Sequence, residues 1–194
     1  MSAIKHVFVL MLENRSFDHM LGFSNLRGRD PFSGQRTQIA GLQGNEENTY
    51  QSTPYRVKSP AGFSMTVGPG HEFPDVLEQL SGAGARYPTA GKYPPVTNSG
   101  FVENFVASGG QQNPGEVMKC FGTGQLPVLT ALANNFAVCD NWFSSLPGPT
   151  WPNRAVTFEM REEQARRSID SRADGHVKSA VGDFHCDVLI LRSV

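Results

Sequence analysis

The sequence predicts an α/β domain with a central, mostly parallel sheet that is incomplete. With 194 residues, 39% hydrophobic and 18% charged, the chain can bury a sizeable core. Val7–Leu12 is a run of six apolar residues rich in β-branched and aromatic types, as in a strand covered on both faces. A second strand is predicted over Ala137–Ser144 from its aromatic and β-branched content, directly after a segment with a regular helical pattern. Two such strands need neighbours on both sides, so the sheet would expose edges if the chain ended here.

The first predicted strand leads directly into polar residues. Glu13 and Asn14 follow Val7–Leu12, and Ser16 then begins a short helix that ends at Gly22. Open α/β sheets keep their active sites at the carboxyl ends of such strands. Glu13 and Asn14 are therefore candidate site residues, the alternative being ordinary loop and capping residues.

Residues 23–100 are predicted to form a long irregular insertion rich in Gly, Pro, Ser and Asn. Such segments are usually lids or binding loops. One helix is predicted here, Asp75–Leu80, introduced by Pro74 and stopped by Gly82. Just before it, the glycines and proline of Val67–Phe73 predict a tight turn that presents His71, either as a functional residue or as an ordinary surface histidine.

Order is predicted to return after residue 100. Phe101–Val106 has an amphipathic pattern and is followed by a break at Gly109–Gly110. Pro114–Met118 starts a short helix, and Gln125–Phe136 places Leu126, Leu129, Leu132 and Ala133 on one face of a longer one. The strand predicted over Ala137–Ser144 comes next.

Leu146–Arg154 is the second segment with a chemical signature. Its prolines and glycine form a rigid turn ahead of Thr150, and Pro152 suits an early helical position. A hydroxyl there lies where backbone N–H groups favour an anion such as phosphate. The alternative for Thr150 is a helix cap and nothing more.

Charge, hydropathy and cysteine content exclude several classes. A net charge of −1 gives no basic surface for nucleic acid, and no apolar run approaches the roughly 20 residues that span a bilayer. Three unpaired cysteines, Cys120, Cys139 and Cys186, argue against a disulfide framework and a cysteine zinc site. The chain as written lacks a signal peptide pattern and is expected in the cytoplasm, or outside it if the true start lies upstream. The oligomeric state is open.

Glu13–His19 together with Leu146–Arg154 resembles the phosphoesterase family of bacterial and plant non-specific phospholipases C and related acid phosphatases. The resemblance covers about residues 3–154. It implies an alkaline-phosphatase-like α/β sandwich that hydrolyses phosphate esters with a bound divalent metal ion of unknown identity. By position, it makes Glu13, Asn14 and Thr150 metal ligands, Thr150 the nucleophile and His71 a second catalytic residue. It also makes Asn153 a substrate-binding residue.

The amino-acid composition of the chain changes after Arg154. Residues 155–194 hold 13 of the 35 charged residues, none of the 13 prolines and two of the 20 glycines. Family members continue further and supply an acidic pair to the metal, which has no counterpart here; Glu162–Glu163, Asp174 and Asp183 read as solvated surface. We therefore predict a phosphoesterase part over 1–154 and a divergent charged tail over 155–194, produced by truncation or a frame shift.

Three functions are consistent with these features. The first is phospholipase C type hydrolysis through a phosphothreonine, favoured by threonine at position 150. The second is an acid phosphomonoesterase of the same family. The third is a catalytically inactive fragment that lacks the distal metal ligands.

Overall fold

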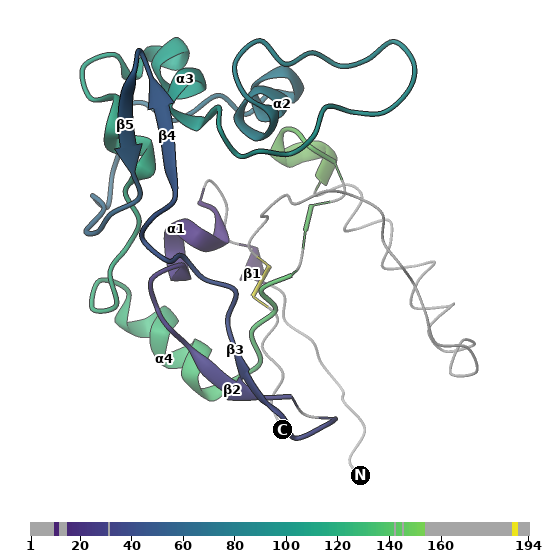
Figure 1. Cartoon of the computed structure of the whole chain (residues 1–194). Coiled ribbons are helices and arrows are strands. Elements are labelled where there is room, and N and C mark those ends of the chain that lie inside the picture. Colours follow the sequence, from purple (N-terminus) through teal and green to yellow (C-terminus); the bar gives the residue numbers. More distant parts are fainter. Residues whose placement is uncertain are drawn as a thin grey trace.

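The computed structural model describes residues 10–11, 15–30, 32–141, 143–144, 146–153 and 188–189. They form a mixed α/β structure whose sheets are three two-stranded antiparallel pairs, and a central parallel sheet is not among them (Figure 1). The strands are β1 (Leu10–Met11), β2 (Arg27–Arg29), β3 (Arg36–Gln38), β4 (Glu47–Tyr50), β5 (Thr53–Arg56) and β6 (Val188–Leu189). The helices are α1 (Phe17–Leu21), α2 (Phe73–Ser81), α3 (Phe101–Phe105) and α4 (Pro127–Asn135), with a π-helical turn η1 (Val106–Gly110) and a 3₁₀ turn η2 (Pro114–Met118).

The strand predicted over residues 7–12 is described only as β1. Leu10 pairs with Leu189 and Met11 with Val188, so the described pairing is antiparallel and reaches into the charged tail. The rest of this strand, with Glu13 and Asn14, lies outside the described residues. The parallel arrangement stays a prediction.

The helix predicted after Ser16 is confirmed as α1. The Ser16 hydroxyl accepts a hydrogen bond from the His19 N–H (3.1 Å), which satisfies one of the donors left open at a helix N-terminus. The Gly22 N–H donates to the Asp18 carbonyl (3.0 Å) and closes the last turn. Leu21 is buried, with Phe17 and Met20 packed against the same cluster, so the helix is held by its cap and by its apolar side chains.

Two β-hairpins occupy part of the insertion that was predicted to be irregular. The β2–β3 hairpin exposes all of its side chains, whereas β4–β5 buries Asn48. The β4–β5 turn places Gln51 and Ser52 at positive φ (48° and 63°), a conformation that usually selects Asn-Gly. Neither residue is typical of that turn, so the sequence carried no hairpin signal there.

The helices of the middle segment agree with prediction, and α3, η1 and η2 contribute side chains to one hydrophobic cluster. Helix α2 follows Glu72 and ends before Gly82, whose φ of 94° suits glycine. Helix α3 continues into η1 up to the break at Gly109 (φ 115°). The cluster is formed by Val102, Val106 and Met118 with Tyr50, Tyr55, Val57, Phe101 and Val117 packed against it. We call it the β4–α3 cluster.

Helix α4 is also confirmed and belongs to a second cluster. The α1–α4 cluster consists of Leu21, Leu26 and Ala133, with Phe17, Met20, Ile39, Leu129 and Val138 against it. Backbone hydrogen bonds join the two clusters through one short segment after η2. Cys120 N–H donates to Lys58 O (2.8 Å) and Phe121 N–H to His19 O (2.8 Å).

The second core strand, predicted over residues 137–144, is wrong for the residues described there. Residues 137–139 form no ladder, and the chain turns at Asp140 and Asn141. The Asp140 carboxylate accepts a hydrogen bond from the Ala40 N–H (2.6 Å), which anchors this segment as a turn instead. Aromatic and β-branched content, which predicted the strand, is a weak signal when, as at Cys139, a side chain of the segment faces solvent. In the parts of the chain that the structure describes, the helices are too short or too polar to cross a lipid bilayer.

Candidate active site

The loop that precedes Thr150 is held by one buried side chain. Asn153 is 8% exposed, and its Oδ1 accepts the Leu146 N–H (2.9 Å). Its Nδ2 donates to the carbonyl oxygens of Leu146 (3.0 Å), Gly148 (3.3 Å) and Pro149 (3.1 Å). Residues 150–153 are helical, so Thr150 begins a helix at the end of a loop whose shape Asn153 fixes. These bonds give Asn153 a structural role, and substrate binding by it stays a prediction.

The Thr150 loop lies against the start of α2. A Cβ added to Gly148 would be 2.6 Å from two carbons of the Phe73 ring, so only glycine permits this approach. Figure 1 shows the helical turn of residues 150–153 beside α2. Phe73 is two residues after His71, and the structure thereby brings the neighbourhoods of two predicted catalytic residues together.

His71 projects from a backbone that is fixed on both sides. The backbone bends at Val67 and at Glu72, and the tight turn predicted between them is not found as a hydrogen-bonded turn. The imidazole of His71 is exposed, with Nε2 3.9 Å from a Glu72 carboxylate oxygen. The Gly70 N–H donates to Asn104 Oδ1 (3.0 Å), and the Gly70 carbonyl accepts from Gln79 Nε2 (2.6 Å). Asn104 and Gln79 carry no sequence signal of such a role, because a neutral amide within an amphipathic helix is unremarkable in a single sequence.

Arg15 connects the first motif to the same region. Glu13 and Asn14 lie outside the described residues. The guanidinium of Arg15, which follows them, donates to Met65 Sδ (3.2 Å) and to the Phe63 carbonyl (3.4 Å). The segment 61–73 therefore runs from the first motif to the start of α2. The described contacts link both motifs of the resemblance through this one segment.

His19 and Cys120 lie where this segment meets the chain after η2. The His19 ring packs edge-on against Phe121, with centroids 4.9 Å apart, and its buried Nε2 has no hydrogen-bond partner. Burial, assisted by the positive charge of Arg15, lowers the pKa of His19 to about 4. Burial raises the pKa of the Cys120 thiol to about 12, and the carboxylates of Asp18 and Glu46 add to the shift. Both groups are neutral near pH 7.

The residues predicted to bind metal are only partly described. Carboxylate, amide and hydroxyl oxygens, as in Glu13, Asn14 and Thr150, are the donors that hard divalent cations prefer. The donor chemistry thus fits such a cation, while the arrangement of the three residues lies outside what is described. Within the described ranges, no group of three His, Cys, Asp or Glu side chains could hold a metal ion.

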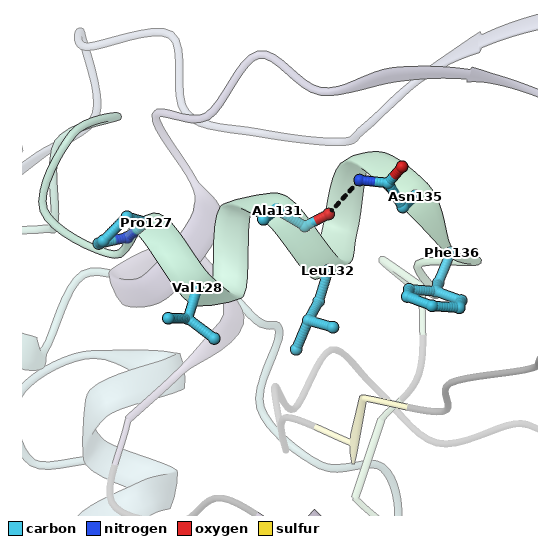
Figure 2. Close-up of a pocket in the computed structure, with 6 residues that line it drawn as sticks. All are labelled: Pro127, Val128, Ala131, Leu132, Asn135 and Phe136. Carbon is cyan, nitrogen blue, oxygen red and sulfur yellow. Dashed lines mark hydrogen bonds between the residues drawn. The ribbon is translucent and has the colours of Figure 1, made fainter.

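An apolar groove runs along α4 but contains none of the predicted site residues. It is lined by Pro127, Val128, Ala131, Leu132, Asn135 and Phe136. Figure 2 shows Val128, Leu132 and Phe136 projecting to the same side of the helix, with Asn135 bonded back to the Ala131 carbonyl (2.7 Å). With Val128 73% exposed and no convergent polar groups, the groove has no catalytic chemistry.

The chain is similar in sequence to phospholipases C of plants and bacteria. The chain is 35% identical over 185 residues to non-specific phospholipase C6 of Arabidopsis thaliana, which covers 94% of this chain and 32% of that protein. It is 36% identical over 162 residues to non-specific phospholipase C3 of the same plant, covering 79% and 28%. Hemolytic phospholipase C of Pseudomonas aeruginosa is 29% identical over 182 residues, covering 93% and 22%. The chain therefore spans about a third or less of the length of these relatives.

A family model matches almost the whole chain. The model is that of the phosphoesterase family, and its match covers residues 4–180, which includes both motifs and runs past Arg154. The mixed α/β structure is consistent with this assignment. The chain belongs to the phosphoesterase family.

Proposed function

We propose that the protein of which this chain is a part hydrolyses phosphate esters in the manner of a phospholipase C, with Thr150 as the nucleophile. The observation that carries the proposal is the placement of Thr150. Asn153 holds the loop before it with four hydrogen bonds, and Gly148 packs that loop against the ring of Phe73, two residues after His71. The relatives are phospholipases C, which supports the same reaction class.

The donor set supports a divalent metal ion held by Glu13, Asn14 and Thr150. A bound hard cation would polarise the phosphoryl oxygens and lower the pKa of the threonine hydroxyl, which is a weak nucleophile without such help. The acidic ligands expected from the distal part of the family would complete this site. We propose the alkaline-phosphatase-like parallel sheet as the scaffold of the complete domain.

The reaction proceeds in two displacements. Thr150 Oγ1 attacks phosphorus in line, so the Oγ1–P bond forms as the bond to the leaving alcohol oxygen breaks. The proton of the Thr150 hydroxyl passes through solvent to the departing alcohol oxygen. Water then attacks the phosphorus of the phosphothreonine, its oxygen forms a new bond to phosphorus as the Oγ1–P bond breaks, and one of its protons returns to Oγ1 while the phosphorylated head group is released. His71 donates a hydrogen bond to the equatorial oxygens, where negative charge develops.

Turnover of two chromogenic substrates tests the proposal. The purified chain is assayed with bis(p-nitrophenyl) phosphate and with p-nitrophenyl phosphate, after EDTA treatment and after addition of Mg²⁺, Mn²⁺ or Ca²⁺. We expect turnover that requires a divalent ion, prefers the diester and is lost in Thr150→Ala. Thr123→Ala, at an exposed loop threonine, is the matched control and retains activity.

Each alternative has its own result in this assay. Preference for the monoester would identify an acid phosphatase. Absence of turnover by folded protein would mean that residues outside this chain are needed to complete the site. Turnover that survives Thr150→Ala would contradict the threonine nucleophile.

A further inference from the structure

We propose that Asn104 and Gln79 are positioning residues that hold the Gly70 peptide and so fix the backbone of His71, two residues before the Phe73 ring on which the Thr150 loop packs. The inference rests on the proposed function, because it assumes that His71 acts at the phosphate. It concerns two neutral amides, one on α3 and one on α2, that neither motif of the family resemblance includes.

Asn104 is buried and its amide is fully used. It is 1% exposed, its Oδ1 accepts from Gly70 N–H (3.0 Å) and Gln79 Nε2 (2.8 Å), and its Nδ2 donates to Asp75 Oδ1 and Glu78 Oε2 (both 3.1 Å). A buried amide costs free energy unless every polar atom is paired. An apolar side chain would join α2 to α3 without that requirement, so the network indicates that a defined geometry is being held.

That geometry is the backbone on either side of His71. Gln79 and Asn104 engage both polar groups of Gly70, and Asp75 Oδ2 accepts the Glu72 N–H (3.0 Å). A Cβ on Gly70 would be 2.3 Å from the Asp75 carboxyl carbon, so this close approach requires glycine.

His71 is thus the single residue between two anchored peptides. Its side chain is 78% exposed, and the bond from the Glu72 N–H to Asp75 belongs to the capping box of α2, so the anchoring that helix capping does not explain is that of Gly70. A catalytic group on an ordered backbone needs no ordering at the moment of reaction, which is the benefit of preorganisation. We call the two hydrogen bonds from Asn104 and Gln79 to Gly70 the clamp. The clamp orders the backbone at His71 while leaving the imidazole exposed to a substrate.

The test compares two buried asparagines. Asn104→Leu removes the clamp. Asn48→Leu is the matched control, because Asn48 is 4% exposed and makes three hydrogen bonds, to Phe101 N–H, Val102 N–H and Asn98 O, without touching Gly70. Amide ¹⁵N relaxation reports backbone order at residues 70–72. Diester turnover is measured in the same variants and again in a His71→Ala background.

We expect the order parameters of residues 70–72 to fall from about 0.85 to below about 0.6 in Asn104→Leu and to stay high in Asn48→Leu. Misplacing His71 should lower kcat by about 10- to 100-fold with KM little changed. In the His71→Ala background, Asn104→Leu should have little further effect, because both substitutions remove the same contribution.

Opposite results would overturn the inference. It fails if residues 70–72 stay ordered in Asn104→Leu, if Asn48→Leu loosens them equally, or if the two losses multiply in the double variant. Should the wild-type chain show no turnover, residues outside this chain are needed to complete the site, and the relaxation measurement still decides whether Asn104 orders residues 70–72. If Asn104→Leu does not fold, Gln79→Met, which removes only two hydrogen bonds, takes its place.

Discussion

At the scale of single residues, His19 shows that a residue of the first motif can be part of the packed interior. Its ring packs on Phe121 and its Nε2 is buried without a partner, so the folded chain disfavours the imidazolium. The pKa is therefore lowered from 6.5 to about 4, with burial as the main cause and Arg15 as the second. Protonation of this one side chain opposes folding.

This predicts a loss of stability in mild acid. Between pH 6.5 and about 4 the unfolded chain binds a proton at His19 that the folded chain does not. The folding stability that depends on a neutral His19 is fully present above pH 6.5 and is lost progressively as the pH falls toward 4. Urea unfolding midpoints should fall over this range, and more shallowly in His19→Phe, which removes the titrating group. Parallel pH profiles for the two proteins would contradict the prediction.

Asn153 tests whether a motif residue binds substrate or shapes its own loop. Asn153→Leu leaves the Leu146 N–H and three carbonyl groups without this partner, so we expect about 1–3 kcal/mol of destabilisation. Asn134→Leu, at an exposed position on α4, is the control and should change stability little. An increase in KM with unchanged stability would instead identify Asn153 as a substrate-binding residue.

At the scale of elements, local signals were sufficient where the cap or breaker lay in the sequence. Ser16 with Gly22 and Pro74 with Gly82 marked the ends of α1 and α2, and the apolar face of residues 125–136 predicted α4. The β4–β5 hairpin was missed because its turn uses Gln51 and Ser52 at positive φ. The segment 137–144 was misassigned because a tertiary hydrogen bond from Ala40 to Asp140 decides its path.

The candidate site divides in the same way. Thr150 and His71 were identified from their motifs and turns, and the structure brings their neighbourhoods together through Gly148 and Phe73. Asn104 could not be identified, because its side-chain partners are 25 to 34 residues away in the chain. The metal-ligand roles of Glu13 and Asn14 stay predictions.

The contact between the Thr150 loop and α2 gives a prediction at this scale. Gly148→Ala places a methyl group within 2.6 Å of the Phe73 ring, so the loop must move or the helix must shift. Overpacking of this kind costs about 1–3 kcal/mol and should also lower turnover. Phe73→Leu should restore part of both losses. Gly68→Ala is the control, since its Cβ meets no atom within 4 Å.

At the scale of the whole molecule, the described core is divided. The α1–α4 cluster and the β4–α3 cluster share no residue, and backbone hydrogen bonds at Lys58, Cys120 and Phe121 join them. Separate clusters connected in this way can open as separate cooperative units.

Matched core truncations test this division. Leu21→Ala and Met118→Ala each remove a buried side chain, one from each cluster, and each should cost about 2–5 kcal/mol. Hydrogen exchange should then accelerate in α1 and α4 for Leu21→Ala, and in α3, β4 and β5 for Met118→Ala. Equal acceleration everywhere in both variants would show a single cooperative unit.

Cys120 lies in the segment that joins the two clusters, so the reaction of its thiol can report when that segment opens. Its thiol is buried and its pKa is raised to about 12, so almost no reactive thiolate is present while the junction is closed. Cys139 is exposed and should be alkylated promptly. In a mixture of iodoacetamide and native chain, the delay between modification of Cys139 and of Cys120 therefore measures how long the two halves of the described core remain joined.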